Sequence, residues 1–258
     1  MVMMHDEAAC TVCGGTGWKT VDRDGISAVE RCECVAAGRV RKLEDAAGIP
    51  PLYQQASLEN FSRVPDNPAA GRILTEALRR TRNYLREYPP ASDEQGLLFV
   101  GDPGSGKTHL AAAVLHDLMA RGFECVFFDY QDLLQRIRSS YEAGATAADR
   151  GAYQTAQDCE VLLLDDLGAH RLTDWVEDIV TSLLTHRSNH KRTLIATTNL
   201  LDPQAGDAPL PEGTAGEMAG RYYLSERIGF RARSRLFEMC RVVSTRGVDD
   251  YRRRKVAR

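Results

Sequence analysis

An eight-residue stretch, GDPGSGKT, carries the clearest chemistry in the sequence. It matches G-x-x-x-x-G-K-[ST] at every fixed position, follows the apolar run LLFV and precedes a helical pattern. Glycines let successive backbone N–H groups point at phosphate oxygens, and a helix start adds the positive end of its dipole. The Lys107 ammonium would neutralise β- and γ-phosphates, and the Thr108 hydroxyl would bind Mg²⁺. The predicted nucleotide site is Gly101, Asp102, Pro103, Gly104, Ser105, Gly106, Lys107 and Thr108.

Two further apolar runs end in polar residues that suit phosphate chemistry. VLLLDDLG places Asp165 and Asp166 at the carboxyl end of a predicted strand, where ligands bind in parallel sheets. Asp165 is predicted to hold Mg²⁺ together with Thr108, and Asp166 to orient or deprotonate the attacking water. IATTNL delivers Asn199, whose amide could hydrogen-bond the γ-phosphate or that water. These residues together predict hydrolysis of a β–γ phosphoanhydride bond.

A cysteine cluster near the start of the chain suggests a metal site. Four of the seven cysteines form CxxC and CxC pairs flanked by turn residues, namely Cys10, Cys13, Cys32 and Cys34. Four thiolates from two short turns fit tetrahedral Zn²⁺, which would supply folding energy to a segment with little core. An iron–sulfur cluster and free thiols are the alternatives. The scattered cysteines are predicted to pack as small apolar residues, namely Cys125, Cys159 and Cys240.

The elements that must position these residues alternate along the chain. Buried strands are predicted at 97–100, 125–129, 161–164, 193–197 and, as a fifth candidate, 241–244. Helical spacing of apolar residues lies at 72–88, 108–121, 131–142 and 174–186. Strands alternating with helices predict an α/β fold with a five-stranded parallel sheet between helices.

Length and composition set the outer limits. A chain of 258 residues, with 43% hydrophobic and 27% charged residues, is ordinary for a globular protein of fewer than two average domains. The sequence has no apolar run long enough for a membrane span and no apolar core of a signal peptide, so we expect a cytoplasmic protein without a membrane partner. The net charge of −3 argues against a globally basic nucleic-acid-binding protein. Residues 227–258 nevertheless hold eleven Lys and Arg against three acidic residues.

The ordered motifs resemble those of one family of AAA+ ATPases. GDPGSGKTHLA, VLLLDDLG, TLIATTNL, SERIGFRARSRLFEMC and VDDYRRR resemble the DnaC/DnaI helicase loaders and the related IstB transposition ATPases. The resemblance covers residues 55–254 and implies an AAA+ P-loop fold that binds ATP and Mg²⁺. We expect a zinc-binding, partner-docking module at 1–45, a connector and helix at 46–90, and the ATPase domain at 91–258.

The resemblance also implies roles for individual polar residues. Asn199 matches the sensor 1 residue, and Arg252 the sensor 2 arginine. Arg235 matches best the arginine finger that reaches the γ-phosphate of a neighbouring subunit. Arg231 and Arg227 lie one and two turns earlier on an expected basic helix and are alternatives. An arginine supplied in trans would stabilise the transferring phosphoryl group and make hydrolysis depend on assembly.

Two partner hypotheses follow from this resemblance. As a loader, the chain would self-associate through its ATP sites, bind a replicative helicase hexamer through the zinc module and deliver it onto single-stranded DNA in DNA replication. The basic C-terminal stretch and a helix carrying Arg136 and Arg138 are the predicted DNA contacts. As an IstB-like ATPase, the chain would assemble on DNA and recruit a transposase. The metal-built module favours the loader, because it suits a protein partner.

Overall fold

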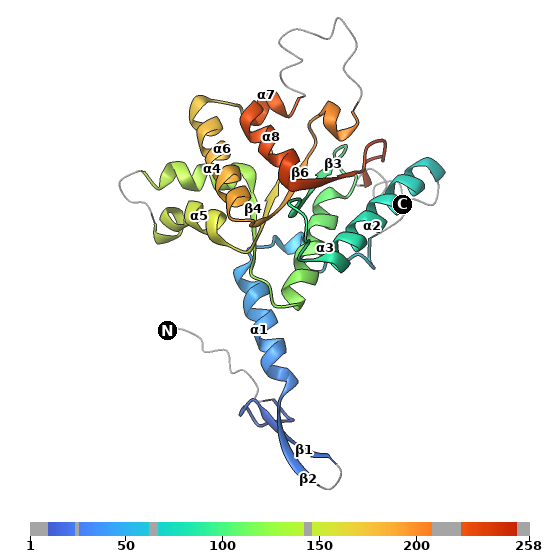
Figure 1. The fold of residues 1–258 in the computed structure, drawn as a ribbon, viewed down its shortest axis with the longest axis vertical. Coiled ribbons are helices and arrows are strands. Elements are labelled where there is room, and N and C mark those ends of the chain that lie inside the picture. Colours follow the sequence, from blue (N-terminus) through green and yellow to red (C-terminus); the bar gives the residue numbers. More distant parts are fainter. Residues whose placement is uncertain (1–9, 24–25, 62–66, 142–145, 208–222, 252–258) are drawn as a thin grey trace, which may run out of the picture.

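A five-stranded parallel sheet forms the centre of the protein (Figure 1). The computed structural model describes residues 10–23, 26–61, 67–141, 146–207 and 223–251. The sheet has the order β4-β5-β6-β3-β7, and all neighbouring strands run parallel. Its strands are Gly96–Val100 (β3), Cys125–Asp129 (β4), Val161–Asp165 (β5), Thr193–Thr198 (β6) and Cys240–Ser244 (β7). The predicted α/β fold and its five strands are therefore confirmed, and the carboxyl ends of the strands share one edge.

Helices cover both faces of this sheet. One layer is Pro68–Glu87 (α2) and Lys107–Ala120 (α3). The other is Tyr130–Ser139 (α4), Ala147–Asp158 (α5), Asp174–Asn189 (α6), Ser225–Ile228 (α7) and Phe230–Met239 (α8). In β3, Leu97 and Phe99 join the first core, whereas Leu98 and Val100 join the second. Burial on both faces explains why the strands are continuous apolar runs.

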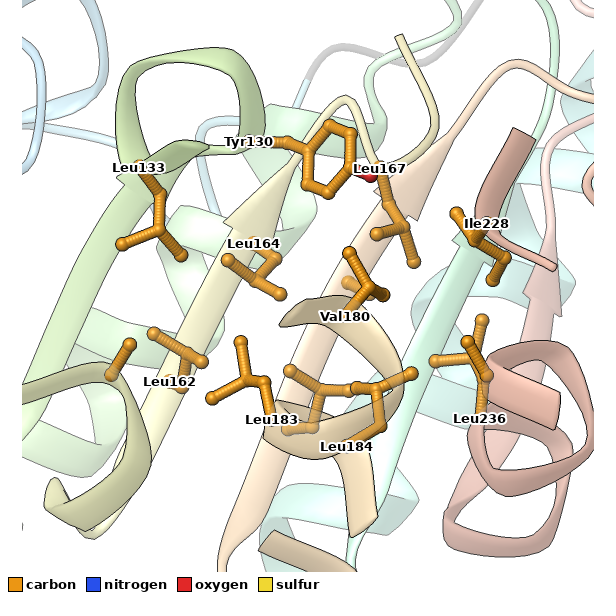
Figure 2. Close-up of a cluster of buried hydrophobic side chains, with 14 of the residues drawn as sticks. Tyr130, Leu133, Leu162, Leu164, Leu167, Val180, Leu183, Leu184, Ile228 and Leu236 are labelled. Atoms are coloured by element: carbon orange, nitrogen blue, oxygen red, sulfur yellow. The ribbon is translucent and has the colours of Figure 1, made fainter. Parts of the chain in front are cut away.

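The second core is the larger cluster of buried side chains. Figure 2 shows Leu162 and Leu164 of β5 beside Leu183 and Leu184 of α6, with Leu236 of α8 in the same cluster. The scattered cysteines lie in the two cores at 2–3% exposure, as predicted: Cys125, Cys159 and Cys240. Packing on this face holds α8 against α6 and β7, in the same cluster as the β5 and β6 side chains that lead to the predicted site.

A hairpin and one helix precede the sheet. Trp18–Arg23 (β1) and Ile26–Arg31 (β2) pair antiparallel, and Glu33–Ala46 (α1) runs from the hairpin to the body of the protein (Figure 1). No residue of α1 is buried. Immediately after it, Ala47 and Ile49 enter the core of the first layer, and the Ala47 carbonyl accepts a 2.7 Å hydrogen bond from the Phe127 N–H. The hairpin is thus attached to the sheet through α1.

Short 3-10 turns at Pro51–Tyr53 (η1) and Pro203–Ala205 (η2) complete the regular elements. Among the described residues, the helices are all too short or too polar to span a bilayer.

Candidate functional site

The glycine-rich loop connects β3 to α3 at the carboxyl edge of the sheet. Gly104 and Gly106 have φ angles of 72° and 96°, a region that other residues rarely adopt. A Cβ at Gly106 would lie 2.6 Å from the Phe61 ring, so glycine is needed there for space as well. Because α3 begins at Lys107, the loop leads directly into a helix N-terminus, the arrangement that binds phosphate groups.

Lys107 is a buried cation that joins this loop to the next strand. Its side chain is enclosed, with the residue 4% exposed. The Nζ donates to the Asp102 carbonyl at 2.9 Å and to Asn199 Oδ1. Burial lowers the pKa of Lys107 to about 8, a shift that nearby Asp166 opposes and Arg246 reinforces. The parallel pairing of β3 with β6 therefore brings together the predicted lysine and the predicted sensor Asn199, 92 residues apart.

The two predicted acids lie beside this pair. Asp165 Oδ1 accepts a 2.7 Å hydrogen bond from the Thr197 hydroxyl, which in turn accepts the Asp166 N–H at 2.9 Å. Burial raises the pKa of the Asp165 carboxyl, while hydrogen bonds from Thr197 and Thr108 oppose that shift. Asp166 Oδ1 accepts from Asn199 Nδ2 at 3.2 Å. Thr197 was missed from the sequence, although its place on the strand that leads to Asn199, two residues earlier, was the available signal.

This donor set fits ATP and Mg²⁺. The loop and helix start could hold phosphates, and the Thr108 hydroxyl and Asp165 carboxylate are oxygen ligands of the kind that Mg²⁺ prefers. Bound Mg²⁺ would neutralise charge on the β- and γ-phosphates. Lys107 supplies a fixed cation, and Asn199 holds the Asp166 carboxylate at the same edge, suited to accept a proton from water.

The basic segment near the end of the chain is two helices. Gly229, with φ 83° and ψ 155°, separates α7 from α8. The expectation that Arg227 lies on the same helix as Arg231 and Arg235 is therefore wrong. Arg227 Nη1 donates to the His170 carbonyl at 3.3 Å and so binds the loop after β5 in its own chain.

Arg231 and Arg235 remain one helical turn apart on α8. Arg231 is exposed and lines a hollow of about 750 Å³ beside α6. Arg235 pairs with Glu238 at 2.7 Å near the surface. Arg233, which lies between them and was not predicted, forms a two-bond pair with Asp202. The predicted sensor 2 residue, Arg252, lies outside the described residues.

The predicted DNA-binding arginines are largely engaged within the chain. In the described part of 227–258, four arginines pair with carboxylates of the same chain, namely Arg233, Arg235, Arg241 and Arg246. On α4, Arg136 pairs with Asp132 at 2.7 Å, and the Arg138 guanidinium lies 5.0 Å from the centre of the Trp175 ring. A count of basic residues therefore overstates the free positive charge of these surfaces.

The four N-terminal cysteines converge at the base of the hairpin. All four Sγ atoms lie within 4.8 Å of one another, with Cys10 to Cys32 at 3.8 Å and Cys13 to Cys34 at 3.4 Å. Tetrahedral zinc thiolates would place sulfurs about 3.8 Å apart, so the cluster fits that ion. The Gly17 N–H hydrogen bond to Cys13 Sγ lowers the pKa of that thiol to about 6, which favours the thiolate that binds metal.

We expect the purified chain to carry one zinc per subunit and Cys13→Ser to lose most of it, because three thiolates leave the ion an open position. Metal analysis of freshly purified protein measures this directly. Cys240→Ser, which changes a buried thiol in the sheet, is the matched control and should keep its zinc. A wild-type chain without stoichiometric zinc would remove the metal assignment.

The parallel sheet, the glycine-rich loop and the polar strand ends define an ATPase of the AAA+ class. The sequence matches the model of the IstB-like ATP binding protein family over residues 37–205. The chain belongs to this family.

The chain is also similar to individual proteins of known name and structure. The chain is 27% identical over 197 residues to the phage-like element PBSX protein XkdC of Bacillus subtilis (strain 168), covering 73% of this chain and 71% of that protein. It is 26% identical over 163 residues to the replicative helicase loader DnaC of Escherichia coli (strain K12), covering 63% of each chain. A crystal structure of the DnaC helicase loader superposes with a TM-score of 0.58 at 30% identity, covering 76% of this chain and 99% of that one. The chain thus spans less than two thirds of the Escherichia coli loader.

Proposed function

We propose that this protein is an ATP-dependent loader that delivers a replicative helicase onto single-stranded DNA. The proposal is supported by the likeness to the DnaC helicase loader, which covers almost all of that structure at 30% identity. ATP would bind at Gly101–Thr108 with Mg²⁺ held by Thr108 and Asp165, and Asp166 and Asn199 would act on the attacking water. Nucleotide would shift the population toward an assembly that holds the partner.

The N-terminal unit is the proposed docking module for the helicase. Residues 1–45 carry the cysteine cluster, and the hairpin lies at the far end of α1 from the sheet (Figure 1). Exposed apolar side chains gather in this unit, with Val12 and Val29 each 66% and Trp18 51% exposed. Exposed aromatic and aliphatic groups of this kind suit a protein partner better than nucleic acid.

A co-elution experiment tests the proposed function. The chain is mixed with the purified helicase hexamer of its host, with and without ATP and single-stranded DNA, and complexes are separated by size. We expect a complex that forms with ATP, is lost in Cys13→Ser and releases helicase on DNA. A helicase that never co-elutes would overturn the loader, and ATP-dependent capture of a purified transposase would establish the IstB-like alternative instead.

The arginine finger is tested by mixing two inactive variants. Arg235→Ala should lower turnover by about a thousandfold if its guanidinium completes a neighbouring site. Lys107→Ala is expected to be inactive for a different reason, the loss of its own phosphate site, so a mixture contains interfaces with one intact composite site. We expect such mixtures to regain ATP hydrolysis, measured as phosphate release across mixing ratios. Failure at every ratio would exclude Arg235 as the finger, and the same mixing experiment with Arg231→Ala then tests Arg231 in that role.

A further inference from the structure

Arg246 stands just after β7, next to the glycine-rich loop, in a position that the proposed chemistry does not use. The preceding residue anchors the segment: the Thr245 N–H donates to the Val100 carbonyl at 2.7 Å, and its hydroxyl lies 2.7 Å from Ser105 Oγ. The Arg246 side chain is only 18% exposed. Burying a cation costs free energy unless it is fully paired, so the enclosed position of Arg246 indicates a specific role.

All five N–H donors of the Arg246 guanidinium have partners. Nε and Nη2 form a fork with the Asp207 carboxylate at 2.9 and 3.1 Å. Nη2 also donates to the Leu200 carbonyl. Nη1 donates to the Asn199 carbonyl at 3.0 Å and lies 3.4 Å from Asp102 Oδ1. Lysine could not reproduce this planar set of bonds, since its ammonium is a point charge with three donors.

Two of these partners are also the partners of Lys107. Lys107 Nζ uses the Asp102 carbonyl and the Asn199 side chain, whereas Arg246 uses the Asp102 carboxylate and the Asn199 carbonyl. The Gly247 N–H adds a 2.9 Å hydrogen bond to Asp102 Oδ2. The glycine-rich loop and the segment at Asn199 are therefore joined twice, once by Lys107, which would bind phosphate, and once by Arg246.

We infer that Arg246 is a positioning residue for ATP hydrolysis. It would hold Asp102 and Asn199 in place when the Lys107 ammonium leaves them to bind phosphate. The inference rests on the proposed nucleotide site and needs no partner protein. Arg246 acts through Asn199, whose amide holds Asp166, so its loss should misplace the groups around the attacking water. A misplacement of about 1 Å can cost about a hundredfold in rate without much loss of ground-state binding.

Steady-state ATP hydrolysis by the full chain tests this. Arg246→Lys and Arg246→Met should lower kcat by at least about tenfold while KM changes by less than about threefold. Arg233→Lys is the matched control, because Arg233 forms a similar fork with Asp202 in the same loop without contacting Asp102 or Asn199. Its kcat should stay within about twofold of wild type once melting curves confirm that each variant is folded.

A double variant shows whether Arg246 works through the loop. The losses in kcat from Arg246→Lys and Asp102→Ala should be less than additive, because each breaks the same contact. A kcat for Arg246→Lys within about twofold of wild type, an equal fall in Arg233→Lys, or fully additive losses would each overturn the inference. Lys107→Ala reports on the nucleotide site separately: if it is inactive while Arg246→Lys is normal, the site stands and only the positioning role fails.

Discussion

Lys107→Ala is expected to lower ATP turnover at least about a hundredfold and to weaken nucleotide binding. The lysine is the buried cation between the glycine-rich loop and Asn199, and both of its present partners are oxygens that phosphate oxygens could replace. Its removal takes a fixed protein cation away from the β- and γ-phosphates in a site where water cannot screen their charge well. Phosphate release and the binding of a fluorescent ATP analogue measure the two effects.

Lys191→Asn is the matched control for this change. Lys191 is exposed and precedes β6 at the opposite edge of the sheet, and asparagine tolerates its φ of 50°. This variant should hydrolyse ATP at the wild-type rate. Unchanged ATPase activity in Lys107→Ala would contradict the assignment of the phosphate site.

Arg187→Met is expected to destabilise the protein by about 4 kcal/mol, among the largest effects that one substitution produces. Arg187, at the end of α6, is completely buried, and its guanidinium donates to backbone carbonyls from three segments. They are the carbonyls of Ala156, Gln157, Cys159, Glu160 and Thr193. Methionine fills similar space but removes the guanidinium donors from these carbonyls, although the Glu160 carbonyl keeps a 3.1 Å hydrogen bond from the Thr193 N–H.

Thermal unfolding measures the loss. A destabilisation of this size should lower the midpoint by roughly 10 °C in a chain of this length. Arg79→Met removes an exposed arginine that pairs with Glu76 three residues earlier, and its midpoint should stay within about 2 °C of wild type, because exposed ion pairs contribute little. A midpoint for Arg187→Met within about 2 °C of wild type would show that solvent or relaxation satisfies these carbonyls.

The sequence predicted the sheet well because its strands are short apolar runs buried on both faces. β3, β4 and β7 match the predicted runs to within one residue, and β5 and β6 gain only their polar last residues. Two helices and the hairpin were missed for the opposite reason. No residue of α1 is buried, and the hairpin carries exposed Val29. Among the α5 side chains that the structure describes, the buried ones are small, namely Ala152 and Ala156. Because these elements bury no large apolar stripe, their sequences show no helical or strand periodicity of apolar residues.

Part of the candidate site could be predicted from the sequence and part could not. The loop at 101–108, the acids Asp165 and Asp166, and Asn199 are visible because each follows a strand end in a motif of fixed spacing. Arg246 could not be found this way, since its role depends on β7 lying next to β3, which spacing along the chain does not reveal. The break at Gly229 was hidden among arginines that continue at helical intervals on both sides.

The solvated helix α1 has a mechanical consequence. Its second half is held to the body of the protein, because Arg39 Nη2 donates to the Gly122 carbonyl at 3.3 Å and Ala47 bonds to β4. The part of α1 before Arg39 is about 9 Å long, so a tilt of about 10° at Arg39 would move the cysteine-bearing start of the helix by nearly 2 Å. The root contacts α3, the helix that begins at Lys107. A shift of α3 on nucleotide binding would thus be passed to the hairpin through α1.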